Sequence, residues 1–273
     1  MISLLKVKNW LDQRGSLLMV FGIPLITISI YLVASWQKEG IGFPLDDAWI
    51  HQTYARNLAQ YGQWVYLLGK PSAGSTSPLW SAWLAIGYWL RLAPLGWAFF
   101  SGFIGLAGIA YIGEKILRKS AFGAIPSVPW MGIFLASEWH LVWAAVSGME
   151  TLFYSFGILL VFYLIVCDRI RWLWVGLGVG VCVWLRPDGF TLLGPALFCL
   201  LLSIESMKEK LKGFLFLWAG IVFPIAAYFL FQHWVGGSWL PNTFFAKQAE
   251  YAILLEVPFL QRFGRIIALP LIG

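Results

Sequence analysis

The sequence predicts an all-α polytopic membrane protein, and three observations lead to this fold class. Of the 273 residues, 60% are hydrophobic and only 12% are charged, whereas a soluble domain has about 25% charged residues. A soluble enzyme of this size could not bury so much apolar surface and is excluded. Short basic patches separate the apolar runs. Seven runs approach the length of about 20 residues that a spanning helix needs, at roughly 16–36, 97–117, 121–143, 151–167, 172–186, 188–204 and 214–231.

The first apolar run, 16–36, is interpreted as an uncleaved first span. Basic residues precede it as in a signal peptide, but the run is too long for one and no small-residue cleavage site follows. Three cysteines lie in or beside later apolar runs: Cys167, Cys182 and Cys199. Because their number is odd and their spacing fits no metal motif, we expect small apolar side chains within spans.

The basic residues indicate the orientation of the spans. The net charge is +6, from 19 basic and 13 acidic residues. The positive-inside rule places short basic patches, and with them the N-terminus, in the cytoplasm. The positive charge therefore reports topology and does not indicate nucleic-acid binding. Eleven basic residues form four such patches: Lys6, Lys8 and Arg14; Lys115, Arg118 and Lys119; Arg169 and Arg171; Lys208, Lys210 and Lys212.

The short apolar run 79–93 is expected not to cross the membrane. The segment 37–77 is external, and the patch after 97–117 is cytoplasmic, so only one crossing can separate them. We expect 79–93 to lie on the outer surface or half inserted, which leaves seven crossings. In the alternative, it crosses and the positive-inside rule fails for three patches. Three tryptophans suit the interface: Trp80, Trp83 and Trp89.

The predicted topology divides the chain into a transmembrane module, 1–250, and a C-terminal segment, 251–273. The module has an external loop at 37–96, which includes the interfacial helix, and a second external loop at 232–250. The C-terminal segment is apolar, with two arginines, and is either an interfacial helix or the start of a further span. Nothing in it resembles a finished C-terminus, so we expect a fragment of a longer protein or a chain that needs a partner.

The first external loop is expected to carry an amphipathic helix. Asp46 follows an extended stretch and can cap a helix at about 47–60. Asp47 and His51 are four residues apart and therefore share one face. An apolar stripe at helical spacing would face the membrane surface or the bundle: Ile50, Tyr54, Leu58 and Tyr61.

The acidic and histidine residues fall mostly on the predicted outer side, although the topology was derived from basic residues. Each has an ordinary explanation, such as helix capping for the Asp pair, a helix-start acid for Glu150, an interfacial pair for Arg186 and Asp188, and solvation for Lys247. Charge beside a span nevertheless suggests function, and convergence on one face favours a site. The set also includes His140. Its members in the two external loops are Asp46, Asp47, His51, Arg56, His233, Asn242 and Lys247.

This combination of residues is suited to group transfer from a lipid phosphate. A carboxylate can accept the proton of an acceptor hydroxyl, and Arg or Lys can hold a departing phosphate. The sequence has no Gly-rich nucleotide loop, so a membrane-carried donor is expected. Asp46, Asp47 and His51 could bind a divalent cation, but their types and spacing do not require one.

Five ordered motifs resemble those of a bacterial group of GT-C glycosyltransferases. The group includes the terminal arabinofuranosyltransferases of mycobacterial cell-wall arabinan and their kin. The resemblance extends over about 45–247, most of the chain. The motifs are LDDAWI at 45–50 with YARNL at 54–58, GSTSPLW at 74–80, SGMET at 147–151, RPDG at 186–189 and PNTFFAK at 241–247. The fourth has Asp where the family has Glu.

The resemblance implies a GT-C-like bundle of about seven transmembrane helices in the cell membrane, with an extracytoplasmic active site. It implies a polyprenyl-phosphate sugar as donor, a glycan or lipid-linked glycan as acceptor, and inversion with Asp46 or Asp47 as base. The donor site would include Glu150, Arg186, Asp188 and Lys247, and we add Arg56, His233 and Asn242 as outer-side candidates. Family members are longer, so the acceptor and the sugar stay open.

Two alternatives to a glycosyltransferase are retained. A transporter or flippase of a lipid-linked sugar should show internal repeats and polar residues at mid-membrane depth, and the sequence shows neither. An inactive, truncated relative that acts as an assembly subunit is compatible with the short chain.

Overall fold

The computed structural model describes residues 2–38, 40–120, 128–166 and 170–272, and these ranges contain no β-strand. The all-α prediction is therefore confirmed for the described part of the chain. The elements are α1 (Ile2–Lys38), α2 (Asp46–Tyr61), α3 (Pro78–Trp89), α4 (Pro94–Ser120), α5 (Trp130–Ser137), α6 (Trp139–Val146), α7 (Thr151–Val166), α8 (Trp172–Leu185), η1 (Pro187–Leu192), α9 (Leu193–Leu202), α10 (Met207–Gly236), α11 (Asn242–Glu250), η2 (Ala252–Glu256) and α12 (Phe259–Ile272).

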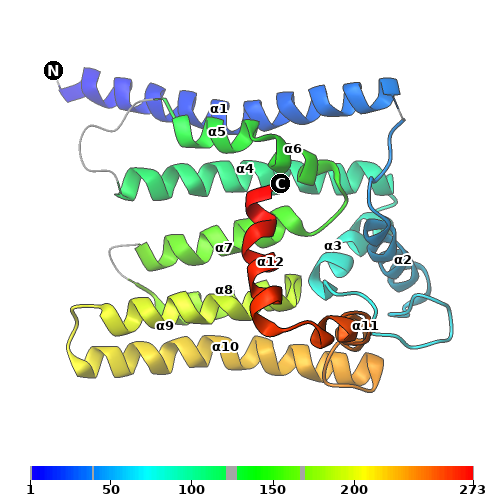
Figure 1. Ribbon diagram of the computed structural model, residues 1–273. Coiled ribbons are helices and arrows are strands. Elements are labelled where there is room, and N and C mark those ends of the chain that lie inside the picture. Colours follow the sequence, from blue (N-terminus) through cyan, green and yellow to red (C-terminus); the bar gives the residue numbers. More distant parts are fainter. Residues whose placement is uncertain (1, 39, 121–127, 167–169, 273) are drawn as a thin grey trace.

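The long helices lie alongside one another in a bundle, and α2, α3 and α11 gather at one end of it, whereas α5 and α6 lie between α1 and α4 (Figure 1). We call the end that carries α2, α3 and α11 the α2 end. The C-terminal end of α4 and the N-terminal ends of α8 and α10 lie at the opposite end (Figure 1), which we call the basic end. The basic patches on these helices therefore share one end of the molecule, as the positive-inside argument requires.

Among the described residues, three helices are long and apolar enough to cross a membrane: Leu17–Lys38, Pro94–Ser120 and Met207–Gly236. Shorter apolar helices cover Thr151–Val166, Trp172–Leu185 and Pro187–Leu202. These lengths are consistent with a membrane protein. The number of crossings and the orientation stay predictions.

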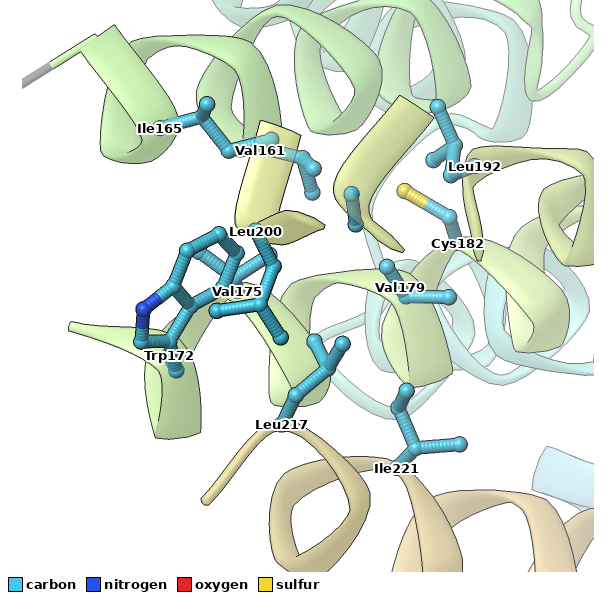
Figure 2. Close-up of a cluster of buried hydrophobic side chains, with 11 residues drawn as sticks. Val161, Ile165, Trp172, Val175, Val179, Cys182, Leu192, Leu200, Leu217 and Ile221 are labelled. Carbon is cyan, nitrogen blue, oxygen red and sulfur yellow. The ribbon is translucent and has the colours of Figure 1, made fainter. Parts of the chain in front are cut away.

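Apolar side chains form a core between α7, α8, α9 and α10 (Figure 2). Val175 and Val179 of α8 are fully buried in it, between Val161 of α7 and Leu217 of α10. The backbones of α8 and α10 meet closely, since a Cβ atom on Gly176 would lie 2.2 Å from the carbonyl oxygen of Leu217. Close approach through small residues is typical of helix packing in membranes.

The predicted span 121–143 is not one helix, and this prediction needs correction. Residues 121–127 lie outside the described part, and the remainder forms α5 and α6 with a break at Glu138. Glu138 has an extended conformation, and its carboxylate accepts a hydrogen bond of 2.9 Å from the amide of Leu141. The side chain thus caps a new helix start and ends α5.

Helix α3 has 12 residues and packs mainly against α2, with further contacts to α4 and α8. It does not run with the long helices (Figure 1), and the expectation that 79–93 does not cross the membrane stays a prediction. The interfacial role predicted for Trp80 is wrong, because this side chain is 1% exposed and its Nε1 donates to the carbonyl of Gly148 at 3.0 Å. Trp83 is partly buried against Trp97, whereas Trp89 is exposed.

Helix α2 begins one residue earlier than predicted, and its N-cap is Leu45 and not Asp46. Its buried face is more polar than the predicted apolar stripe and includes His51, Gln52 and Asn57 beside Tyr54. The end of the predicted stripe, Tyr61, is exposed. The stripe therefore faces the bundle at Tyr54 and partly at Leu58, and the buried face of α2 extends beyond it to polar residues that the prediction did not include.

The remaining predictions concern the cysteines and the C-terminal segment. Cys182 is buried and Cys199 is partly buried, as expected for small apolar side chains, while Cys167 lies outside the described residues. The C-terminal segment forms η2 and α12, and α12 runs across the direction of the long helices (Figure 1).

Candidate functional site

Polar side chains from separate segments meet inside the α2 end, and we call this set the polar cluster. All members except Arg186 are at most 2% exposed. Polar groups buried this deeply need partners, so their grouping is a specific feature of the fold. The polar cluster consists of His51 in α2, Ser75 and Ser77 in the loop before α3, Ser81 in α3, Glu150 before α7 and Arg186 after α8.

A sharp turn directs Glu150 into the cluster. Gly148 has φ +77°, in the left-handed region that favours glycine. A Cβ atom at this position would lie 2.5 Å from the Phe43 ring, so the turn also needs the small residue for space. The indole of Trp80 holds the Gly148 carbonyl from the other side, and the turn is fixed on both faces.

Glu150 and Arg186 form the central ion pair. The distance from Arg186 Nη1 to Glu150 Oε1 is 3.0 Å, and Arg186 Nη2 lies 3.4 Å from Asp188 Oδ2. The guanidinium also lies over the ring of Tyr154, 5.8 Å from its centroid. Because the Arg186 side chain is 37% exposed while Glu150 is buried, the arginine is anchored on one side and open on the other.

His51 connects Glu150 to the serines. Its Nδ1 lies 3.0 Å from Ser81 Oγ and 3.3 Å from Ser75 Oγ, and the two hydroxyl oxygens are 2.9 Å apart. Its Nε2 faces Glu150 Oε2 at 3.5 Å. Ser77 closes the cluster by donating its hydroxyl hydrogen to the carbonyl of Leu185.

Burial shifts the proton affinities of both acid–base groups. Removal from water lowers the pKa of His51 to about 4; Asp47 opposes this shift and Arg186 adds to it. Burial also raises the pKa of Glu150, while backbone hydrogen bonding and Arg186 act in the opposite direction. His51 is therefore neutral at neutral pH, and its contact with Glu150 is not an ion pair.

The predicted catalytic pair, Asp46 and Asp47, lies at the solvent-exposed start of α2. The carboxylate of Asp46 accepts a hydrogen bond of 2.9 Å from the Asp47 amide. Asp47 lies one turn before His51 and influences it electrostatically. Two exposed carboxylates thus stand beside the polar cluster without belonging to it.

The cation site considered for Asp46, Asp47 and His51 is not assembled. In the described ranges, no group of three or more His, Cys, Asp or Glu side chains is arranged to hold a metal ion. His51 is buried, and each of its ring nitrogens already faces a polar side chain, while both aspartates face solvent. These three residues therefore do not converge on one point.

The structure does not join the other predicted residues to the polar cluster. Between described residues, no hydrogen bond or ion pair links Glu150 or Arg186 to Arg56, His233, Asn242 or Lys247. Arg56 is exposed beside Asn57, at 3.5 Å. His233 stacks on Trp239 at 4.5 Å.

Asn242 and Lys247 are exposed on α11, which lies at the same end of the bundle (Figure 1). His140 is exposed on α6 and pairs with Glu138 at 2.6 Å, apart from the cluster. The α2 end thus combines a tight buried cluster with looser polar residues around it.

Two cavities open at the α2 end. One of about 310 Å³ lies between the end of α1 and the segment before α2, and is lined by Tyr31, Ser35, Phe43 and Pro44. The second, of about 400 Å³, lies between the loop after α2 and the end of α10, and its lining includes Trp64 and Trp234. Both are of the size that small ligands occupy.

The sequence did not predict the roles of Ser75, Ser77 and Ser81. The first two lie in the GSTSPLW motif, and Ser81 follows it directly. Serine is common in loops, so the spacing of Ser75 and Ser77 carries little information. The position of Ser81 within an otherwise apolar helix was the one sequence feature that could have indicated a buried polar contact. Comparisons with protein-family models, with curated proteins and with solved structures found no match for this chain.

Proposed function

We propose that the protein is a membrane glycosyltransferase that moves a sugar from a polyprenyl phosphate to an extracytoplasmic glycan or lipid-linked acceptor. One observation carries the proposal. Segments distant in the sequence place a solvent-facing arginine, anchored by a buried glutamate, at the same end of the bundle as two exposed aspartates. These are the groups that displacement at a sugar–phosphate bond needs.

In the proposed reaction, Asp46 or Asp47 takes the proton from an acceptor hydroxyl. The hydroxyl oxygen then attacks the anomeric carbon of the donor sugar, and the bond from that carbon to the phosphate oxygen breaks. The bonding electrons leave with the phosphate, which gains negative charge. Arg186 stabilises this charge by charge-assisted hydrogen bonds from its exposed side. Attack opposite the leaving group inverts the anomeric centre.

The GT-C-like motifs support a glycosyltransferase more than they support a transporter or an assembly subunit. A transporter needs polar groups at mid-membrane depth, whereas the side chains packed around Val175 and Val179 between α7 and α10 are apolar. The buried polar side chains of α10, Tyr228 and Gln232, lie in its C-terminal half, towards the α2 end. The polar cluster lies at one end of the bundle, as a site for a lipid-borne headgroup would. An assembly subunit would bind the lipid donor without turnover, so a turnover assay separates it from an enzyme.

The test is to incubate the purified protein in lipid nanodiscs with polyprenyl-phosphate sugars and mixed glycan acceptors, and to measure released polyprenyl phosphate. We expect release from the wild type and a loss of at least about a hundredfold in Asp46→Asn or Asp47→Asn, the range for removal of a general base. Glu205→Gln, at the exposed basic end, is the matched control. No release with any donor, or full activity in both aspartate variants, contradicts the proposal.

A further inference from the structure

His51 is the one buried ring in α2 whose two nitrogens both face polar side chains from other segments. The histidine ring therefore connects α3, through Ser81, with the turn before α7, through Glu150. A ring that only filled space in a helix interface would not need polar partners at both edges. This arrangement suggests a directional role.

The partners of the two ring nitrogens favour one tautomer, because the hydroxyl groups near Nδ1 can donate, whereas an ionised carboxylate near Nε2 can only accept. Serine hydroxyls donate readily, and Ser81 Oγ is the closer of the two to Nδ1, at 3.0 Å. Either atom can donate in the contacts Ser75 Oγ–Ser81 Oγ, at 2.9 Å, and Ser81 Oγ–His51 Nδ1. The chain in which Ser75 donates to Ser81 and Ser81 donates to Nδ1 leaves the Glu150 side of the ring free to donate. The neutral ring has a single N–H, which this chain leaves on Nε2, directed at Glu150.

Glu150 divides its two carboxylate oxygens between two partners. Oε1 accepts from Arg186 at 3.0 Å, whereas Oε2 is buried without a hydrogen bond and faces His51 Nε2 at 3.5 Å. The Ser77 hydroxyl also acts on Glu150 and favours its ionised form. A buried carboxylate oxygen without a partner is costly. The ring N–H at this distance is electrostatically favourable, and it opposes rotation of the carboxylate away from Arg186.

We propose that His51 is a positioning residue for Arg186, acting through Glu150. The inference rests on the proposed function, in which Arg186 holds the departing phosphate. The long arginine side chain has many rotamers when free, and holding it before the donor binds avoids that entropy loss at the moment of binding. Ser75 and Ser81 fix the ring, the ring fixes Glu150, and Glu150 fixes one edge of the guanidinium. The opposite edge, which pairs with exposed Asp188 at 3.4 Å, reaches solvent and is the edge that the departing phosphate contacts.

Two substitutions of similar size separate this role from simple packing. Glutamine places its amide nitrogen near the position of Nε2, so His51→Gln keeps a donor toward Glu150. Asparagine places its amide near Nδ1, so His51→Asn keeps only the contact with Ser81. Both variants preserve a polar group in the same helix, and thermal unfolding in detergent checks that both fold.

The first measurement is the steady-state kinetics of both variants with a polyprenyl-phosphate sugar. We expect His51→Asn to lower kcat/KM for the donor about tenfold, a moderate misplacement effect, with KM for the acceptor unchanged. His51→Gln should stay within about twofold of the wild type. Equal values for the two variants, or an effect confined to the acceptor, overturn the proposal.

The second measurement does not need turnover. ¹⁵N NMR of histidine-labelled protein in detergent distinguishes the two neutral tautomers, and the His51 signal is the one that disappears in His51→Gln. We expect the proton on Nε2 at neutral pH. A proton on Nδ1 overturns the positioning role even if the enzyme is active. Conversely, if the proton is on Nε2 but the protein turns over no donor, the result supports the described geometry and contradicts the proposed function.

Discussion

Two buried glutamates lie at opposite ends of the bundle and are satisfied differently. Glu114, in α4 near the basic end, is 6% exposed; its Oε1 lies 2.6 Å from Arg118 Nε, and its Oε2 accepts the amides of Met131 and Gly132 at 3.1 and 3.2 Å. Glu150, at the α2 end, is 1% exposed and leaves one oxygen without a hydrogen bond. Glu114 is fully used in holding α4 to the start of α5, whereas Glu150 holds an arginine that is still open to solvent.

The difference separates a structural carboxylate from a site carboxylate. Backbone amides at a helix start are fixed donors, and a carboxylate on them stabilises the helix start. An incompletely paired group deep in a protein is typical of places where function sets the requirement. The comparison therefore predicts that changes at Glu114 act on stability and changes at Glu150 act on activity.

Glu114→Ala is expected to show the largest effect. It removes a buried partner from Arg118 and leaves two helix-start amides without an acceptor, which should lower the free energy of unfolding by about 4 kcal/mol. Denaturant unfolding in detergent measures it. Glu114→Gln keeps an acceptor and should lose less. If Glu114→Ala were as stable as the wild type, Glu114 would not have the structural role that the comparison assigns to it.

The pH dependence of stability should come next in size. The pKa of His51 is about 4 in the folded protein and 6.5 in the unfolded chain, so the unfolded state takes up a proton first as the pH falls. This contribution is complete above pH 6.5 and is lost towards pH 4, by about 3 kcal/mol. Glu150, with its raised pKa, has the opposite sign: its contribution is present at low pH and is lost as the pH rises through its folded pKa. In unfolding measured across this window, His51→Gln should show a smaller decrease than the wild type, and parallel curves would contradict this prediction.

Glu150→Gln is expected to reduce turnover about a hundredfold, equivalent to about 2.7 kcal/mol, because a neutral amide holds Arg186 less firmly. The free energy of unfolding should change by less than about 1 kcal/mol, since the amide fills the same space and no buried charge is left unpaired. Released polyprenyl phosphate and denaturant unfolding are measured on the same sample. Glu114→Gln serves as the control and should keep its turnover. Full activity in Glu150→Gln would make the two glutamates equivalent.

Ser75→Ala should have the smallest effect. It removes the first hydroxyl of the chain to His51, which costs about 1 kcal/mol for one hydrogen bond. The midpoint of thermal unfolding measures the change. Ser137→Ala, at an exposed position in α5, is the matched control, and an equal shift in both variants would show that the serine chain adds nothing.

The sequence predicted the helices best where apolar runs were long. The run 97–117 became α4, and the short run 79–93 became a helix outside the main bundle, because length and flanking charge are one-dimensional signals. The run 121–143 failed because Glu138, a single polar residue, caps a new helix. Its effect depends on a local hydrogen bond that composition does not show.

The site was predicted in part for a similar reason. Glu150, Arg186 and Asp188 were expected to act together and do meet. His51 was considered as an outer-side residue that could bind a cation, and it is instead buried against Ser81. Which face of α2 is buried depends on the packing of α3, and no periodicity in α2 itself reveals it.

The contacts of α3 have a consequence for local motion. Two adjacent residues of this helix contact the two segments that carry His51 and Glu150. Trp80 is hydrogen-bonded to the turn before Glu150, and Ser81 is hydrogen-bonded to His51. Separation of either segment from the cluster therefore breaks a hydrogen bond to α3. The start of α7, the middle of α2 and all of α3 should therefore open together in hydrogen exchange, as one cooperative unit with one protection factor. Helix α3 would then set the opening free energy of the whole α2 end.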